Sequence, residues 1–128
     1  MVDHATPRTI RVLNSTRGTV LGDRIGVADR ALSRFIGLLG TLSLSPGGGL
    51  LIYPSQGVHT IGMAFPIDVI FLDRNYRVVQ LRECLKPFRM TALNWHAASV
   101  LELPVSSIQN SLTKIHDQLV IDTEAPSA

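Results

Sequence analysis

Alternating and continuous runs of apolar residues predict a chain of short strands separated by Gly- and Pro-containing turns. Residues 8–16 alternate well enough for a first strand, and residues 19–28 read as two short strands around a tight turn at Gly22-Asp23. The β-branched segments 66–73 and 77–83 predict a β-hairpin. Further strands are predicted at residues 50–53, 98–104 and 118–122.

Two segments have the spacing of a helix. Leu32, Phe35, Ile36 and Leu39 follow the i, i+3, i+4, i+7 pattern of one buried stripe, which predicts the principal helix near residues 29–39. A short helix is expected near residues 105–112. Many strands with few helices predict a mainly β fold, α+β by count, and favour a compact β-sandwich or a partly open barrel.

Length and composition fit one globular domain. The chain has 128 residues, of which 45% are hydrophobic, enough for a single core. We expect this domain to span residues 8–122, between a flexible N-terminus at residues 1–7 and a flexible C-terminal tail at residues 123–128.

Charge and cysteine content limit the classes of partner. The net charge of +2 is too small to indicate nucleic acid or an anionic membrane as a partner. The single cysteine forms no internal disulfide, and residues 1–30 resemble no export signal. We therefore expect a cytoplasmic protein that binds neither nucleic acid nor membrane.

An aspartate interrupts the most apolar segment of the chain. Asp68 lies within PIDVIFLD, whose neighbours predict a strand covered on both faces. A buried carboxylate without partners is costly, so Asp68 must be paired, shift its pKa upward, or lie at an opening. It could pin a turn through backbone or arginine donors, serve a function, or be exposed at the strand end.

His59 precedes the same strand, but Gly62 and Pro66 break the pairing between them, so its side chain could converge with Asp68 or diverge from it. If they converge, the carboxylate would orient the imidazole for base catalysis or metal binding. A hydrogen-bonded structural histidine is the alternative. Thr60 could satisfy the local backbone, and Met63 could fill a gap in the core.

The motifs RFIGLLGTLSLSPGGGLLIYP, HTIGMAFPIDVIFLD, LKP and VLELP resemble domain of unknown function family 192, also called uncharacterised protein family 0127. The resemblance covers residues 24–122 and implies a β-sandwich with jelly-roll character and a small helical element. The family has no settled activity, so a cofactor stays unknown. The family's recurrent residues match here at Arg34, Gly37, Leu38, Leu39, His59, Thr60, Met63, Pro66, Ile67, Asp68, Phe71, Asp73, Pro87, Glu102 and Leu103.

The chain departs from the family pattern at four places. Thr41 and Ala64 stand where basic residues are usual, so an anionic ligand of the family would bind poorly here. Glycines after VLELP and near the end are replaced, within 105–107 and at His116. At each of these two turns the backbone must be remodelled, or keep its shape at a cost of about 1 kcal/mol.

Three classes of function stay open, and the sequence leans away from an enzyme. The first is a small-ligand-binding or interaction module, and no catalytic or metal-binding residue is assigned in it. The second is a metal-dependent hydrolase or oxygenase using His59, Asp68, Glu102 and His96 or His116. The third is an assembly protein with a contact patch around Phe88 and Trp95, although Trp95 equally fits a lid over the core. The candidate ligand-binding residues are His59, Asp68, Arg34, Glu102, Thr60 and Met63.

Overall fold

The computed structural model describes residues 9–28, 45–58, 60 and 65–122. The predicted principal helix, Arg34, His59 and Met63 lie outside the described residues, as do the two chain ends expected to be flexible.

Seven strands in this part of the chain form one sheet, in the order β5-β4-β6-β3-β2-β1-β7. Six neighbouring pairs hold it together, and only β2 and β3 run parallel. The elements are β1 (Thr9–Asn14), β2 (Thr19–Ala28), β3 (Gly48–Ile52), β4 (Ile67–Leu72), β5 (Val78–Leu85), β6 (Ser99–Pro104), α2 (Ser107–Asn110) and β7 (Leu119–Asp122).

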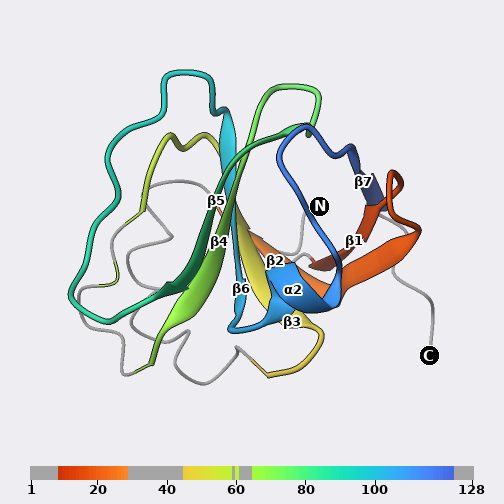
Figure 1. The fold of residues 1–128 in the computed structure, drawn as a ribbon, viewed down its shortest axis with the longest axis horizontal. Helices are drawn as coiled ribbons and strands as arrows, with labels where there is room; N and C mark the ends of the chain where they lie inside the picture. Colours follow the sequence, from red (N-terminus) through yellow and green to blue (C-terminus); the bar gives the residue numbers. More distant parts are fainter. Residues whose placement is uncertain (1–8, 29–44, 59, 61–64, 123–128) are drawn as a thin grey trace, which may run out of the picture.

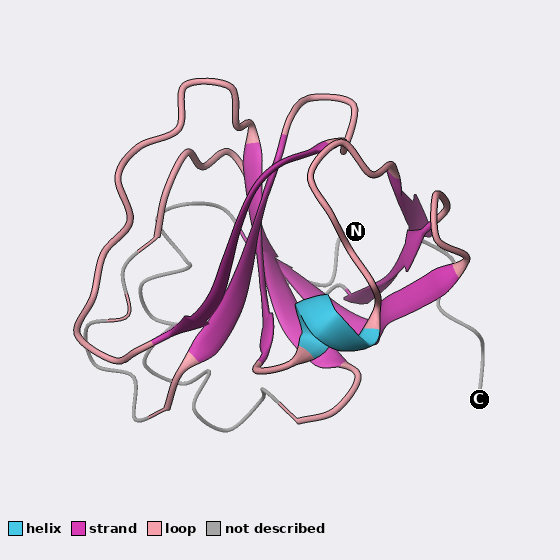
Figure 2. Cartoon of the chain, in the orientation of Figure 1, coloured by secondary structure: helices cyan, strands magenta, loops and turns pink. Residues whose placement is uncertain are grey.

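The sheet curls until its two edge strands meet at one end (Figure 1). An isolated bridge pairs Arg77 with Gln118, just before β5 and β7 begin. Beside it, the Val78 N–H donates to the Asp117 carbonyl at 2.9 Å, and the Leu119 N–H donates to the Tyr76 carbonyl at 3.0 Å. Of the predicted architectures, the structure therefore has the partly open barrel, with a strong predominance of strand over helix (Figure 2). The described strands do not divide into the two sheets of a sandwich.

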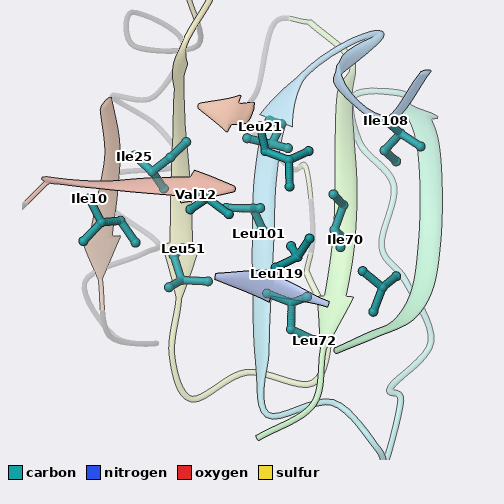
Figure 3. Close-up of a cluster of buried hydrophobic side chains, with 12 residues drawn as sticks. Ile10, Val12, Leu21, Ile25, Leu51, Ile70, Leu72, Leu101, Ile108 and Leu119 are labelled. Atoms are coloured by element: carbon teal, nitrogen blue, oxygen red, sulfur yellow. The ribbon is translucent and has the colours of Figure 1, made fainter. Parts of the chain in front are cut away.

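The inner face of the curl holds the largest core cluster (Figure 3). Every strand contributes to this inner cluster, and Ile108 of α2 belongs to it as well. Each strand can contribute because its side chains alternate between the two faces of the sheet, with a period of two residues. The inner cluster consists of Ile10, Val12, Leu21, Ile25, Leu51, Ile70, Leu72, Val78, Leu101, Leu103, Ile108 and Leu119.

The outer face carries the alternate residues of the central strands, among them Val69, Phe71 and Val100. Two long segments, 53–58 and 86–98, run beside this face on the left of Figure 1. Val58 and Ala97 from these segments pack against the outer cluster. Because both faces are covered, all six residues of β4 are buried, as its continuous apolar run predicts.

The hairpin prediction is confirmed, because β4 and β5 pair antiparallel. The prediction of two strands around Gly22-Asp23 is wrong. β2 is one continuous strand, and its pairing with β1 shifts register around the Val12–Gly22 pair instead of reversing. The N–H groups of Asp23 and Arg24 both donate to the Gly47 carbonyl, which holds the chain in line with β3. The short helix is confirmed, although it spans only Ser107–Asn110.

The two replaced glycines keep the backbone of a glycine turn. Ser106 has φ 78° and His116 has φ 79°, both in the left-handed region that disfavours a side chain. We expect Ser106→Gly and His116→Gly each to raise the free energy of unfolding by about 0.5–1 kcal/mol, after the larger entropy of the unfolded glycine chain is counted. Urea denaturation measures this.

Ser107→Gly is the matched control, because Ser107 lies in α2, where glycine lowers stability. If Ser106→Gly and His116→Gly destabilise the protein as Ser107→Gly does, the strain argument is wrong.

Candidate functional site

Asp68 lies on the inner face of the sheet, where both of its carboxylate oxygens accept main-chain hydrogen bonds. The Cys84 N–H donates to Oδ1 at 2.9 Å, and the Ile108 N–H donates to Oδ2 at 2.9 Å. Asp68 is only 1% exposed. Of the readings left open by the sequence, this geometry is that of a carboxylate satisfied by backbone donors.

The two donors explain why the fold needs a carboxylate at this position. Cys84 has φ 52° at an irregularity in the β4–β5 pairing, so its N–H points away from the ladder and toward Asp68. Ile108 lies in the first turn of α2, whose preceding residue, Ser106, makes no side-chain cap. Asp68 supplies that missing acceptor from a distant strand.

Glu102 points to the opposite face. On β6 it alternates with Leu101 and Leu103 of the inner cluster, so it shares the outer face with Val100. Asp68 alternates in the same way with Val69 on β4 and shares the inner face with Ile70. The sheet therefore separates the two carboxylates, and they cannot bind one metal ion together.

Glu102 is a buried carboxyl in apolar surroundings. It is 7% exposed, and its cross-strand neighbours are Leu50 on β3 and Val69 on β4. Burial raises the pKa of Glu102 to about 7. No ion pair or hydrogen bond links its carboxyl to another described residue. Near neutral pH this carboxyl can therefore either donate or accept a hydrogen bond.

Thr60 joins the two segments beside the outer face, contrary to the expectation of a local backbone contact. Its hydroxyl donates to the Lys86 carbonyl at 2.6 Å and accepts from the Arg89 N–H at 2.9 Å. Two residues earlier, the Val58 carbonyl accepts from the Thr91 N–H at 3.0 Å. Both residues that flank His59 in sequence are thus fixed against the segment 86–98, beside the face that carries Glu102.

Among the described residues, no group of three or more His, Cys, Asp or Glu side chains could hold a metal ion. His96 and His116, the two optional metal ligands, are both exposed. Within the same residues, no helix has the length and apolar character to cross a membrane.

The segment 86–98 exposes large apolar side chains. Phe88 is 71% exposed, Met90 69%, Leu93 55% and Trp95 79%, so the expectation that Trp95 covers the core is wrong. Three hydrogen bonds fix the turn that carries Trp95, whose ring projects outward. The Asn94 N–H donates to the Gln56 carbonyl, the Ala97 N–H donates to the Asn94 carbonyl, and Gln56 Nε2 donates to the Trp95 carbonyl. The assembly hypothesis stays a prediction.

Trp95 also lines an open cleft that the sequence analysis did not foresee. The cleft has a volume of about 680 Å³, and we call it the aromatic cleft. Its walls come from three turns far apart in the sequence. The tryptophan and the two tyrosines of the chain are all there, and Tyr76 and Trp95 each stand between polar residues, which is the only signal the sequence offered. Its main side chains are those of Tyr53, Gln56, Arg74, Tyr76, Trp95 and His96.

Comparison with known proteins finds relatives named as UPF0127 proteins. It is 31% identical over 118 residues to a UPF0127 protein of Thermococcus sibiricus, covering 88% of this chain and 75% of the relative. It is 32% identical over 114 residues to a UPF0127 protein of Pyrococcus furiosus, covering 84% of this chain and 95% of the relative.

Two solved structures share the fold at 18% identity and a TM-score of 0.71. One is a Sinorhizobium meliloti protein proposed to be a transcription regulator, with 91% of this chain and 94% of that chain covered. The other is a Novosphingobium aromaticivorans protein of unknown function, with 88% and 83% covered. The family model for domain of unknown function 192, described as "Uncharacterized ACR", matches residues 12–121. With its motifs, its relatives and its fold in agreement, the chain belongs to the domain of unknown function 192 family.

Proposed function

We propose that this protein is a small-ligand-binding module with a polar site around Glu102 on the outer face of the barrel, and that His59, which lies outside the described residues, contributes to ligand binding. The observation that carries the proposal is the buried Glu102 carboxyl, which has a raised pKa and no partner among the described residues. A perturbed carboxyl in apolar surroundings is a typical functional-site candidate, because burial without a partner lowers stability.

Asp68 and Glu102, which the sequence placed in one candidate site, have different roles in this proposal. Asp68 serves the scaffold, since its oxygens hold α2 and the irregular end of β5. Glu102 faces the side on which Val58 and Thr60, the neighbours of His59, are anchored. Arg34 and Met63, which the family resemblance adds, stay predictions.

The chemistry of this site favours a ligand that donates hydrogen bonds. A carboxyl with a pKa of about 7 accepts hydrogen bonds in both protonation states and is partly ionised near neutral pH, so it would attract hydroxyl groups or an organic cation. Thr41 and Ala64 stand where the family usually has basic residues, which lowers the attraction for anions. We therefore propose neutral polyols, such as sugars, as the ligand class.

Thermal-shift screening with neutral sugars, organic cations and anionic metabolites tests the proposal. A ligand at 100 times its Kd adds about 2.7 kcal/mol of stability, a readily measured rise in Tm. We expect Glu102→Gln and His59→Ala to abolish the rise for the sugar or cation that binds.

Asp68→Asn is the control. Its Tm without ligand should fall, but its ligand-induced rise should persist, because Asp68 faces the other side of the sheet. A rise that is lost in Asp68→Asn and kept in Glu102→Gln would reverse the assignment, and a panel without any hit would contradict the function.

A further inference from the structure

We propose that the aromatic cleft is a second, separate binding site, which takes a small ring compound carrying a phosphate group. It shares no lining residue with the site around Glu102, so it does not depend on the function proposed above. Its volume of about 680 Å³ lies within the range of small-molecule sites in proteins.

The walls of the cleft are held in place before any ligand arrives. The Ser55 N–H donates to the Ala98 carbonyl at 3.0 Å, and the Asn94 N–H donates to the Gln56 carbonyl at 2.9 Å. These bonds tie the Tyr53 turn to the Trp95 turn across about 40 positions of sequence. A preformed cleft loses less conformational entropy on binding than a loose one.

The third wall is fixed by Asp73. Its Oδ1 accepts the N–H of Asn75 at 2.8 Å and that of Arg77 at 2.9 Å, which closes the turn that presents Arg74 and Tyr76. The carboxylate nearest to Arg74 in sequence is therefore used by the backbone. No ion pair with another described residue neutralises the guanidinium of Arg74.

Ring recognition comes from aromatic side chains left exposed at the cleft. Trp95 is 79% exposed and Tyr53 58% exposed, although large aromatic residues are normally mostly buried. Exposed rings that line one preformed cleft can stack on the flat face of a base or on the apolar face of a sugar. Gln56 adds an amide for hydrogen bonds to a ring substituent.

Phosphate recognition comes from the charge of the cleft. Arg74 and His96 line it, and no acidic side chain of the described residues does. A guanidinium can donate two parallel hydrogen bonds to a phosphate, and an imidazole adds another donor. The combination of stacking rings and donors without an opposing carboxylate selects a ring-bearing phosphate over a neutral ring or a bare phosphate.

Trp95 is the only tryptophan of the chain, so its fluorescence reports on the cleft alone. We expect AMP to cause a saturable change in the fluorescence of the full-length protein, with weaker binding of adenosine and of inorganic phosphate. Ribose 5-phosphate is titrated in the same way as a second ligand. Binding of AMP in preference to it assigns the ring to a base, whereas equal or tighter binding of ribose 5-phosphate assigns the ring to a sugar.

Arg74→Gln should weaken binding about tenfold or more, because it removes a charge-assisted hydrogen bond. Arg82→Gln, at an exposed β5 arginine outside the cleft, should change it less than about twofold. Calorimetry measures ligand binding by Trp95→Ala and by the conservative variant Trp95→Tyr, which keeps an aromatic ring. The comparison separates the loss of stacking from a general loss of structure, and circular dichroism checks that both variants fold.

The inference is overturned if neither organic phosphate gives a saturable signal, or if Arg74→Gln and Arg82→Gln weaken binding equally. Glu102→Gln should leave this titration unchanged, so failure here and failure of the site around Glu102 are distinguishable.

Discussion

Asp68→Ala is expected to lower the free energy of unfolding by about 3 kcal/mol. The substitution removes the acceptor of the buried Ile108 N–H and of the part-buried Cys84 N–H, and an unpaired donor that water does not reach costs about 1–3 kcal/mol. Asp68→Asn keeps one oxygen acceptor and should cost about half as much. Urea denaturation followed by circular dichroism measures the difference.

Asp23→Ala is the matched control for this prediction. Asp23 is also an aspartate within a strand, but its side chain is 59% exposed and its nearest cation, Arg24, lies 3.7 Å away. Such a surface pair contributes about 0–1 kcal/mol. Equal losses of stability in Asp23→Ala and Asp68→Ala would show that the two main-chain contacts of Asp68 do not stabilise the fold.

Glu102→Gln is expected to raise the free energy of unfolding, in contrast to Asp68→Ala. This gain should appear only above acidic pH. The pKa of Glu102 rises from 4.5 to about 7 on folding, because burial disfavours the charged form. Between these values the folded state binds more protons than the unfolded state, so wild-type stability falls as pH rises. The total contribution is about 3 kcal/mol, complete near pH 8.

Glutamine carries no charge at any pH and has nearly the size of the protonated acid. The variant should therefore match the wild type near pH 4 and exceed its stability by about 3 kcal/mol near pH 8. The free energy of unfolding is measured by denaturation at both pH values for the variant and the wild type. Because other groups titrate alike in both proteins, their contribution drops out of the difference. Glu83→Gln, at an exposed glutamate of β5, should show no such divergence. Parallel pH profiles for Glu102→Gln and the wild type would contradict a raised pKa.

Asp68 and Glu102 are expected to have opposite effects on stability, which distinguishes a structural residue from a candidate functional residue. Asp68 and Glu102 are both buried acids on neighbouring strands. Asp68 holds the fold through hydrogen bonds, and Glu102 is expected to lower stability at neutral pH. A residue that lowers stability without a structural benefit is the better candidate for function.

Local pattern by itself determined the strands, the hairpin and the burial of β4, because the side-chain period of a strand is written in adjacent residues. Pattern also showed that a carboxylate at Asp68 needs partners. It failed at Gly22-Asp23, where the Asp23 and Arg24 N–H groups donate to the Gly47 carbonyl and keep β2 in line with β3, since that contact comes from a turn distant in sequence.

Only the tertiary structure decided which carboxylate faces which side, and which residues form the aromatic cleft. The breaks at Gly62 and Pro66 prevent counting of strand parity from His59 to Asp68, and no count relates β4 to β6. The cleft gathers Tyr53, Arg74 and Trp95 from three turns. Their meeting depends on the order and curl of the strands, which arise from long-range pairing and burial and not from any local sequence signal.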